Sequence, residues 1–314
     1  MLPRPGDYSF RNRAKIVWSI LIINVIAFVM LTLAGGSTDT GVLIKFGALS
    51  SNLISEGQYW RLITCTFLHA NFIHLGFNMF CLFIFGPTAE ISFGRIKFLL
   101  IYLIAGVGGS ATSYVFMDPR SFGVGASGAV FGVLGSIAVY YYLNQHIYGK
   151  YGRGMMTGIG VIVLLNIGYG FTVQNVDNWA HIGGLVFGIL VAFGLQKHRS
   201  ELGFGIFGTY FLRIIVLAII LVGILVFVAK DNPVNSLNKA QTLFEEKKYE
   251  SSINQLEKII DNNPNWGKAY LLKGKVLAEY IDENAGKDDL IKAIRLGNEN
   301  TRTEAIKSLS DSNN

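Results

Sequence analysis

The chain has 314 residues, of which 51% are hydrophobic and only 15% are charged, with a formal net charge of +6. This balance is typical of a membrane protein and excludes a soluble globular enzyme. The excess positive charge belongs to residues 1–230, which hold fifteen Lys and Arg against seven Asp and Glu, whereas residues 231–314 hold twelve against fourteen. Short basic loops between apolar segments mark one face of a membrane, so no nucleic-acid partner is indicated. The cysteines, Cys65 and Cys81, are too few for a disulfide framework or a structural zinc site.

Seven apolar stretches approach the roughly 20 residues with which a helix crosses the hydrocarbon core. They comprise residues 16–34, 71–89, 97–116, 125–143, 156–173, 179–196 and 211–229. The first stretch is too long for a cleavable signal peptide and is expected to stay in the mature protein. We therefore expect an all-α, polytopic membrane helical bundle. It would consist of a short N-terminus at 1–15, a six-span core at 16–200, and a loop with a seventh helix at 201–230.

Basic residues are distributed unequally between alternate connections of these spans. With Arg213 assigned to the loop before the seventh span, eleven Lys and Arg lie on one side and three on the other before the tail. Basic loops stay on the cytoplasmic side, so the N-terminus is predicted to be cytoplasmic in a multi-pass protein of the cell membrane. Seven crossings then place residues 235–314 outside the cell, as expected for a bacterial plasma membrane.

The tail at 235–314 is helical in pattern and mixed in charge. Its spacing fits one tetratricopeptide repeat at Ala240, Tyr249, Leu256 and Pro264, with a degenerate second copy at Tyr270, Gly274, Leu277 and Ala293. We therefore predict a small soluble α-helical, tetratricopeptide-like domain that offers a groove to a protein ligand. Fewer than three good copies are marginal for a solenoid, so a purely structural helical tail stays open as the alternative.

Polar groups within the predicted spans are few, and they gather in three places. His74 and Asn78 lie one turn apart near the start of the second span, Ser127 opens the fourth, and His181 opens the sixth. With a cytoplasmic N-terminus, all three spans begin on the outer side, so these groups share one layer roughly 5 to 10 Å below the outer surface. Such residues are costly in a membrane and are usually functional. The shared depth predicts a single site where the three spans meet.

Glycines predict close contact between the fourth and sixth spans. The small-residue stripes are Gly128, Gly132 and Gly135 on one helix, and Gly184 and Gly188 on the other, on the face of His181. Contact along these stripes would bring the Ser127 hydroxyl within hydrogen-bond reach of the His181 imidazole, the pairing that activates a serine nucleophile. Free N–H groups at the start of the Ser127 helix could bind an oxyanion, and His74 and Asn78 supply further donors.

Each of these residues also has a structural explanation when taken alone. A lone GxSG is a weak motif, His181 could pack against a carbonyl, and Asn78 could bridge helices. A zinc site from His69, His74 and His181 is disfavoured, because no HExxH is present and no acidic residue lies at their depth within a span. Asp177 could orient the imidazole as a third triad member or be an ordinary acidic residue of the outer loop.

Several separate motifs between about residues 40 and 200 resemble the rhomboid family of intramembrane serine proteases. They are Trp60-Arg61, the HxxxxHxxxN pattern of His69, His74 and Asn78, Gly125-Ala126-Ser127-Gly128, and Ala180-His181 followed by Gly184 and Gly188. Seven spans followed by tetratricopeptide-like helices are similar to a bacterial rhomboid subgroup, although members of that subgroup carry a longer soluble N-terminal domain than these 15 residues.

The resemblance implies specific roles for these residues. Ser127 and His181 would form a catalytic dyad without a catalytic acid, and His74, Asn78 and the Ser127 N–H would bind the oxyanion. By the same resemblance, Phe77 and the fifth span would form a lateral gate for a substrate helix.

Other positions have supporting or open roles under the resemblance. The Trp60-Arg61 loop would brace the scaffold. Phe131 stands where some rhomboids have a tyrosine beneath the catalytic histidine, so stacking should persist without the hydroxyl. Glu90 could pair with a basic residue or be an interfacial acid.

The expected activity is hydrolysis of a peptide bond in a single- or multi-pass membrane protein, near the outer leaflet, without a cofactor. Substrates should contain weak helix formers near the scissile bond, because a stable helix hides its carbonyls. A catalytically silent rhomboid-like binder or adaptor is the alternative. A transporter is less favoured, because the polar residues stop in the outer layer.

Overall fold

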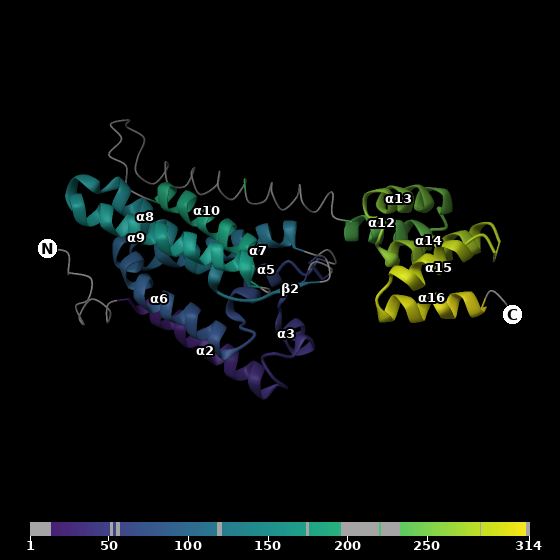
Figure 1. The fold of residues 1–314 in the computed structure, drawn as a ribbon, viewed down its shortest axis with the longest axis horizontal. Coiled ribbons are helices and arrows are strands. Elements are labelled where there is room, and N and C mark those ends of the chain that lie inside the picture. The colour runs from purple at the N-terminus through teal and green to yellow at the C-terminus, as the bar shows by residue number, and fades with distance from the viewer. Residues whose placement is uncertain are drawn as a thin grey trace. The chain divides into compact units, whose positions relative to one another are not determined.

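The computed structural model describes residues 14–311, except 51–52, 55–56, 118–120, 174–175, 196–219, 221–232 and 283. The chain separates into two compact units, Met1–Leu225 and Val226–Asn314. Figure 1 labels the helices of both units. The described part of the first unit is helical apart from one short strand pair, which confirms the predicted all-α polytopic class.

Six of the predicted spans coincide with helices. These are α2 (Lys15–Leu33), α6 (Phe72–Phe93), α7 (Arg95–Phe116), α8 (Ser127–Leu143), α9 (Gln145–Thr172) and α10 (Asn178–Leu195). Among the described residues, five of them are long and apolar enough to cross a membrane, and α8, with 17 residues, is slightly shorter. The seventh predicted span, 211–229, lies outside the described residues except for Ile220.

Several predicted boundaries differ from the observed ones, among them the starts of α8 and α9. Helix α8 begins at Ser127 rather than at 125, because Gly125 has a φ of +131°, which a helix cannot continue. Helix α9 begins at Gln145 rather than at 156, and its chain passes through a kink at Gly149, where φ is 49° and ψ is −124°. The added turns are polar, so apolarity gave no signal for them.

Helix α8 forms the centre of the bundle. It contacts α6, α7, α9 and α10, and most of its residues are buried. Its hydrophobicity extends around the whole helix, as expected for a helix surrounded by other helices. The start of α8, where Ser127 lies, is therefore fixed by neighbours on several sides.

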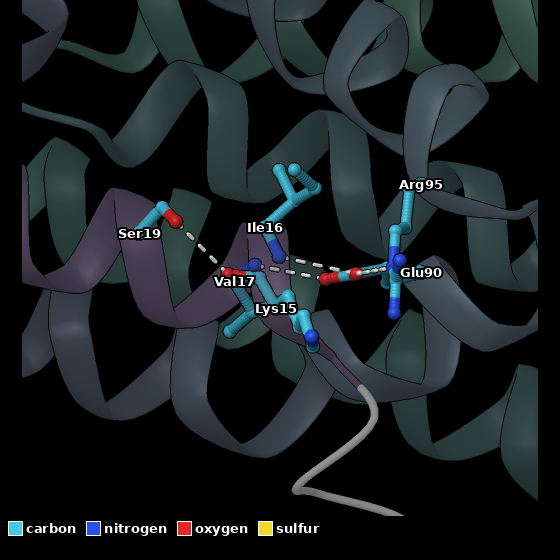
Figure 2. A network of polar contacts seen from close by, with 6 residues as sticks. All are labelled: Lys15, Ile16, Val17, Ser19, Glu90 and Arg95. Carbon is cyan, nitrogen blue, oxygen red and sulfur yellow. Dashed lines mark hydrogen bonds and ion pairs between the residues drawn. The ribbon is translucent and has the colours of Figure 1, made fainter.

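Glu90 connects α6 to the beginning of α2, the purple helix of Figure 1. Figure 2 shows its carboxylate facing the first turn of α2, where it accepts hydrogen bonds from the backbone N–H groups of Ile16 (3.1 Å) and Val17 (2.8 Å). Helix α2 has no side-chain cap of its own, so this buried carboxylate satisfies donors that would otherwise lack partners. The exposed Arg95 lies 3.9 Å away. Glu90 therefore has a basic neighbour, but its main partner is the α2 N-terminus.

The second unit is an array of short helices. They are α12 (Pro233–Glu245), α13 (Tyr249–Asn262), α14 (Gly267–Tyr280), α15 (Lys287–Leu296) and α16 (Glu299–Asp311). Ala240 and Leu256 are fully buried between α12 and α13, and Tyr270 and Ala293 are buried between later helices. The helical character of the tail is thus confirmed, while its assignment to tetratricopeptide repeats stays a prediction.

Candidate active site

Ser127 is the first residue of α8 and follows a sharp change in chain direction. Gly125 precedes it with a left-handed φ and donates its N–H to the carbonyl of Cys65 (2.9 Å). The first hydrogen bond of the helix runs from Val130 N–H to the Ala126 carbonyl (2.9 Å), and no side chain caps this end. The N–H groups of the first turn therefore point beyond the helix, beside the Ser127 hydroxyl.

His74 lies directly against the loop before Ser127. A Cβ atom added to Gly125 would be only 2.7 Å from the Cε1 and Nε2 atoms of His74, so only glycine lets the imidazole approach this closely. Asn78 is buried one turn further along α6, and its amide donates one hydrogen bond to the His74 carbonyl (3.0 Å). The second N–H of that amide is not used by this bond.

His69 supports the same loop from the other side. The Ala126 N–H donates a long hydrogen bond (3.5 Å) to its Nε2, and its ring meets that of His74 edge-on with centroids 5.1 Å apart. Burial lowers the pKa of His69 to about 3, and the nearby His74 contributes in the same direction. His69 is therefore neutral at physiological pH, which is the state that can accept a hydrogen bond.

His181 lies in the first turn of α10 and is buried. Its ring is stacked on Phe131, with centroids 4.3 Å apart and planes 6° from parallel. Phe131 follows Ser127 by four residues, so the histidine ring is held over the same face of α8 that carries the serine. Among the described residues, His181 Nδ1 is buried without a hydrogen-bond partner.

Helices α8 and α10 touch backbone to backbone beside these two residues. A Cβ on Gly184 would lie 2.0 Å from the Gly128 carbonyl oxygen, and one on Gly188 would lie 2.3 Å from Gly132 Cα. A Cβ on Gly128 would lie 3.0 Å from the carbonyl oxygen of Ala180. Ser127 precedes Gly128 and His181 follows Ala180, so both residues adjoin this contact.

Comparison with known proteins identifies relatives of this chain. The model of the rhomboid domain matches residues 56–198. The chain is 33% identical over 190 residues to the rhomboid-type protein YdcA of Bacillus subtilis (strain 168), covering 59% of this chain and 90% of YdcA. The chain belongs to the rhomboid family.

Two further relatives extend the match. Rhomboid protease GluP of Bacillus subtilis (strain 168) is 37% identical over 246 residues, which are 77% of this chain and 46% of GluP. RHOMBOID-like protein 5 of Arabidopsis thaliana is 41% identical over 173 residues, which are 55% of this chain and 54% of that protein. This rhomboid thus spans about half the length of these two relatives.

Arg61 organises the segment between α2 and α6 in this rhomboid. Its guanidinium donates to the carbonyls of Ile44 (2.7 Å) and Ala48 (3.0 Å) and to the Gln58 side chain (2.8 Å). These bonds connect α5 (Arg61–Thr64) to α3 (Thr40–Phe46), and the Trp60 ring lies beneath the guanidinium, 4.6 Å from it.

The same segment between α2 and α6 reaches the residues before Ser127. Strand β1 (Leu49–Ser50) pairs antiparallel with β2 (Phe122–Gly123). The η1 turn (Cys65–Phe67) accepts a hydrogen bond from the N–H of Gly125, two residues after β2. Burial raises the pKa of the Cys65 thiol to about 11, so this thiol stays protonated. The loop that carries the Trp60-Arg61 motif is therefore connected by strand pairing to the chain that leads into Ser127.

The residues predicted for a lateral gate lie at the periphery. Phe77 projects from α6 with 69% of its surface exposed. Helix α9 has just three buried residues, Gly152, Ile159 and Val163, and none of its residues after Val163 is buried. The last turns of α9 are therefore weakly packed, and the gating role of this helix stays a prediction.

Asp177 is a site residue whose role the sequence analysis missed. Its carboxylate caps α10, accepting a hydrogen bond from Ala180 N–H (2.9 Å), and also accepts one from the Ser113 hydroxyl of α7. It is neither hydrogen-bonded to the His181 ring nor an ordinary loop acid. An Asp directly before an apolar helical run is a typical N-cap residue, and this signal could have identified the role of Asp177 from the sequence.

Metal ligation finds no support in the described part of the chain. There, no group of three or more His, Cys, Asp or Glu residues is arranged to hold a metal ion. His69 is turned toward the Ala126 N–H, and His181 is stacked on Phe131. Two of the three histidines considered for zinc therefore have other neighbours.

Proposed function

We propose that this rhomboid is an intramembrane serine endopeptidase that cleaves membrane-anchored proteins. The observation that supports the proposal is the glycine contact between α8 and α10, which adjoins Ser127, together with the buried His181 stacked on Phe131 one turn after the serine. The name of its relative GluP, a rhomboid protease, supports it. A hydroxyl becomes a useful nucleophile only when a base removes its proton, and His181 is the base available.

The proposed reaction has two halves. Ser127 Oγ attacks the scissile carbonyl while His181 takes the hydroxyl proton, and the oxyanion receives hydrogen bonds from the Ser127 N–H, His74 and Asn78. His181 then donates its proton to the leaving amine, which leaves an acyl group on Ser127. Water, deprotonated by His181, attacks the acyl carbon, and the proton returns to Ser127 as the carboxylic acid product departs.

The substrate is a membrane segment that can expose its backbone. Peptide bonds within a stable helix are hydrogen-bonded, so cleavable segments should contain glycine, alanine or other residues that loosen the helix near the scissile bond. The weakly packed last turns of α9, after Val163, and the exposed Phe77 favour access between α6 and α9. By the distribution of basic residues, cleavage occurs near the outer leaflet.

We propose that residues 235–314 lie on the extracytoplasmic side and bind a protein ligand. The positive-inside rule and an odd number of spans support this orientation. Protease added to intact spheroplasts should digest residues 235–314, and protection until the membrane is permeabilised would contradict the assignment. If the tail holds the outer part of a substrate, deleting it should slow cleavage of a substrate with an outer domain but not of a short membrane segment.

The protease proposal is tested with purified full-length protein in detergent and a panel of single-pass membrane proteins. Wild-type protein should produce two fragments, and Ser127→Ala should produce none. A chelator should leave the rate unchanged, whereas a loss reversed by added zinc would point to a metal enzyme. Tight binding of panel members without cleavage by the wild type would favour the catalytically silent binder.

A further inference from the structure

The outer ends of three elements meet at the carboxylate of Asp177. They are the first turn of α10, the last turns of α7, and strand β2, which leads into Ser127. Asp177 itself is half-buried at the start of α10. A carboxylate has two oxygens with room for several donors, so one side chain can serve more than one element.

The first contact is with α10. Asp177 Oδ1 accepts from Ala180 N–H at 2.9 Å, and the Asp177 carbonyl accepts from His181 N–H at 3.2 Å. This is the geometry of a helix N-cap, and the negative charge also suits the positive end of the helix dipole. Both residues that receive this support, Ala180 and His181, belong to the contact with α8. Fraying of this turn would displace the imidazole directly.

The second contact is with α7. The Ser113 hydroxyl, on a fully buried residue, donates to Asp177 Oδ2. Four residues before Ser113 on the same face is Gly109, where an added Cβ would lie 2.7 Å from the Ala180 carbonyl oxygen and 3.3 Å from Gly128 Cα. Glycine contacts determine how closely α7 and α10 approach each other, but they do not prevent one helix from sliding along the other. The hydrogen bond to Ser113 sets the position of α10 along α7.

The third neighbour is the segment before the serine. A Cβ on Gly123 of β2 would lie 3.6 Å from Asp177 Oδ2, so the strand passes alongside the carboxylate with little space between them. Gly123 precedes Ser127 by four residues. The Asp177 carboxylate thus lies next to both segments that carry the proposed dyad, β2 before Ser127 and the first turn of α10 at His181.

We propose that Asp177 is a positioning residue for catalysis: by capping α10 and binding Ser113 of α7, it holds His181 in register with Ser127. It acts through the backbone of the first turn of α10 and does not touch the reacting atoms. This inference rests on the proposed protease function and adds to it a residue outside the dyad and the oxyanion site.

The test compares five variants of the 314-residue chain in detergent, namely four single variants and the double variant of Asp177→Ala with Ser113→Ala. Asp177→Ala removes both contacts, Ser113→Ala removes the contact to α7, and Asp177→Asn keeps an N-cap acceptor and a group that can pair with the Ser113 hydroxyl. Asp39→Ala is the matched control, because Asp39 caps α3 in the same way, accepting from Val42 N–H at 2.8 Å. Each variant is measured for kcat, KM and thermal unfolding. The rate at which a fluorophosphonate phosphonylates Ser127, with loss of fluoride, is measured as well.

Asp177→Ala should lower kcat about 10²-fold, the effect of a displacement near 1 Å between reacting groups, with KM nearly unchanged. The phosphonylation rate should fall in parallel, and Asp177→Asn should recover most of both. The double variant with Ser113→Ala should be no slower than Asp177→Ala, because the other contact of the Ser113 hydroxyl, to Met117 Sδ at 3.9 Å, does not reach α10. Asp39→Ala should lower the unfolding temperature without lowering kcat.

Equal kcat for Asp177→Ala and Asp39→Ala at a temperature where both are folded would overturn the positioning role, as would an effect of Asp177→Ala on KM alone. Wild-type and Ser127→Ala proteins run in parallel keep the two proposals distinct. Turnover that depends on Ser127 but not on Asp177 rejects the positioning role alone. Absence of turnover that depends on Ser127 rejects the protease function and the positioning role with it.

Discussion

Replacing Gly184 with alanine would place a methyl group inside the contact between α8 and α10. The added Cβ would lie 2.0 Å from the Gly128 carbonyl oxygen, 2.5 Å from its carbonyl carbon and 2.8 Å from its Cα. All three are backbone atoms of a central helix, so no side chain can rotate away. Real Cβ contacts are almost never shorter than 3.0 Å, so the helices must separate by about 1 Å.

That separation acts directly on the Ser127–His181 pair, because both residues adjoin the contact. A misplacement of about 1 Å costs on the order of 10² in rate, and overpacking costs about 1–3 kcal/mol of stability. We therefore expect Gly184→Ala to lower kcat about 10²-fold at temperatures where the protein is still folded. Initial rates on a single-pass substrate, with circular dichroism to follow unfolding, measure both effects.

The matched control is Gly154→Ala on α9. An added Cβ there has nothing within 4 Å, so the change should be neutral or stabilise the helix by about 0.5–1 kcal/mol. Unchanged kcat in Gly184→Ala, with the control behaving as expected, would refute the reasoning that the helix contact sets the dyad. An equal loss in both variants would show that any alanine in these helices impairs the enzyme.

Three further changes test the account at other points. Glu90→Gln removes the charged acceptor from the α2 N-terminus and should lower the free energy of unfolding by about 1.5–3 kcal/mol in denaturant titrations; a loss no larger than that of Arg95→Ala would contradict the capping role. Because burial lowers the pKa of His69 to about 3, the unfolded chain takes up a proton below pH 6.5 that the folded chain does not. The contribution of neutral His69 to the free energy of unfolding is therefore complete above pH 6.5 and is lost as the pH falls toward 3, at up to about 1.4 kcal/mol per pH unit. The unfolding temperature of His69→Gln should therefore fall less on acidification than that of the wild type. Asn78→Ala should lower kcat by about 10² to 10³ without raising KM if its free N–H binds the oxyanion, and an effect confined to KM would assign Asn78 to substrate binding.

The helical bundle could be predicted from sequence because hydrocarbon imposes a length and an apolarity on every span. The spans at 71–89, 97–116 and 179–196 agree with α6, α7 and α10 to within a few residues. Outside the hydrocarbon that constraint disappears, which is why the polar beginning of α9 was missed. The predicted start of α8 was wrong because Gly125 has a left-handed φ and lies against His74, features that local sequence does not reveal.

The candidate site was predictable to the extent that it depends on depth and small residues. The shared depth of His74, Ser127 and His181, with glycines on facing helices, predicted a single site; the structure shows the glycine contact between α8 and α10, and the catalytic roles stay a prediction. Supporting contacts were not predictable, because they join distant parts of the chain. Glu90 reaches N–H groups more than seventy residues away, and Asp177 meets a serine 64 residues earlier on α7.

Ser127 and His181 are claimed to act as one catalytic unit, and the most direct measurement is a double-mutant comparison of cleavage rates. Ser127→Ala, His181→Ala and the double variant should all fall to the same residual rate on a single-pass substrate, because each change removes the same proton transfer and groups that act together are grossly non-additive. Thermal unfolding of the three variants should stay close to that of the wild type. Appreciable turnover by Ser127→Ala, or a double variant far slower than either single variant, would contradict the claim.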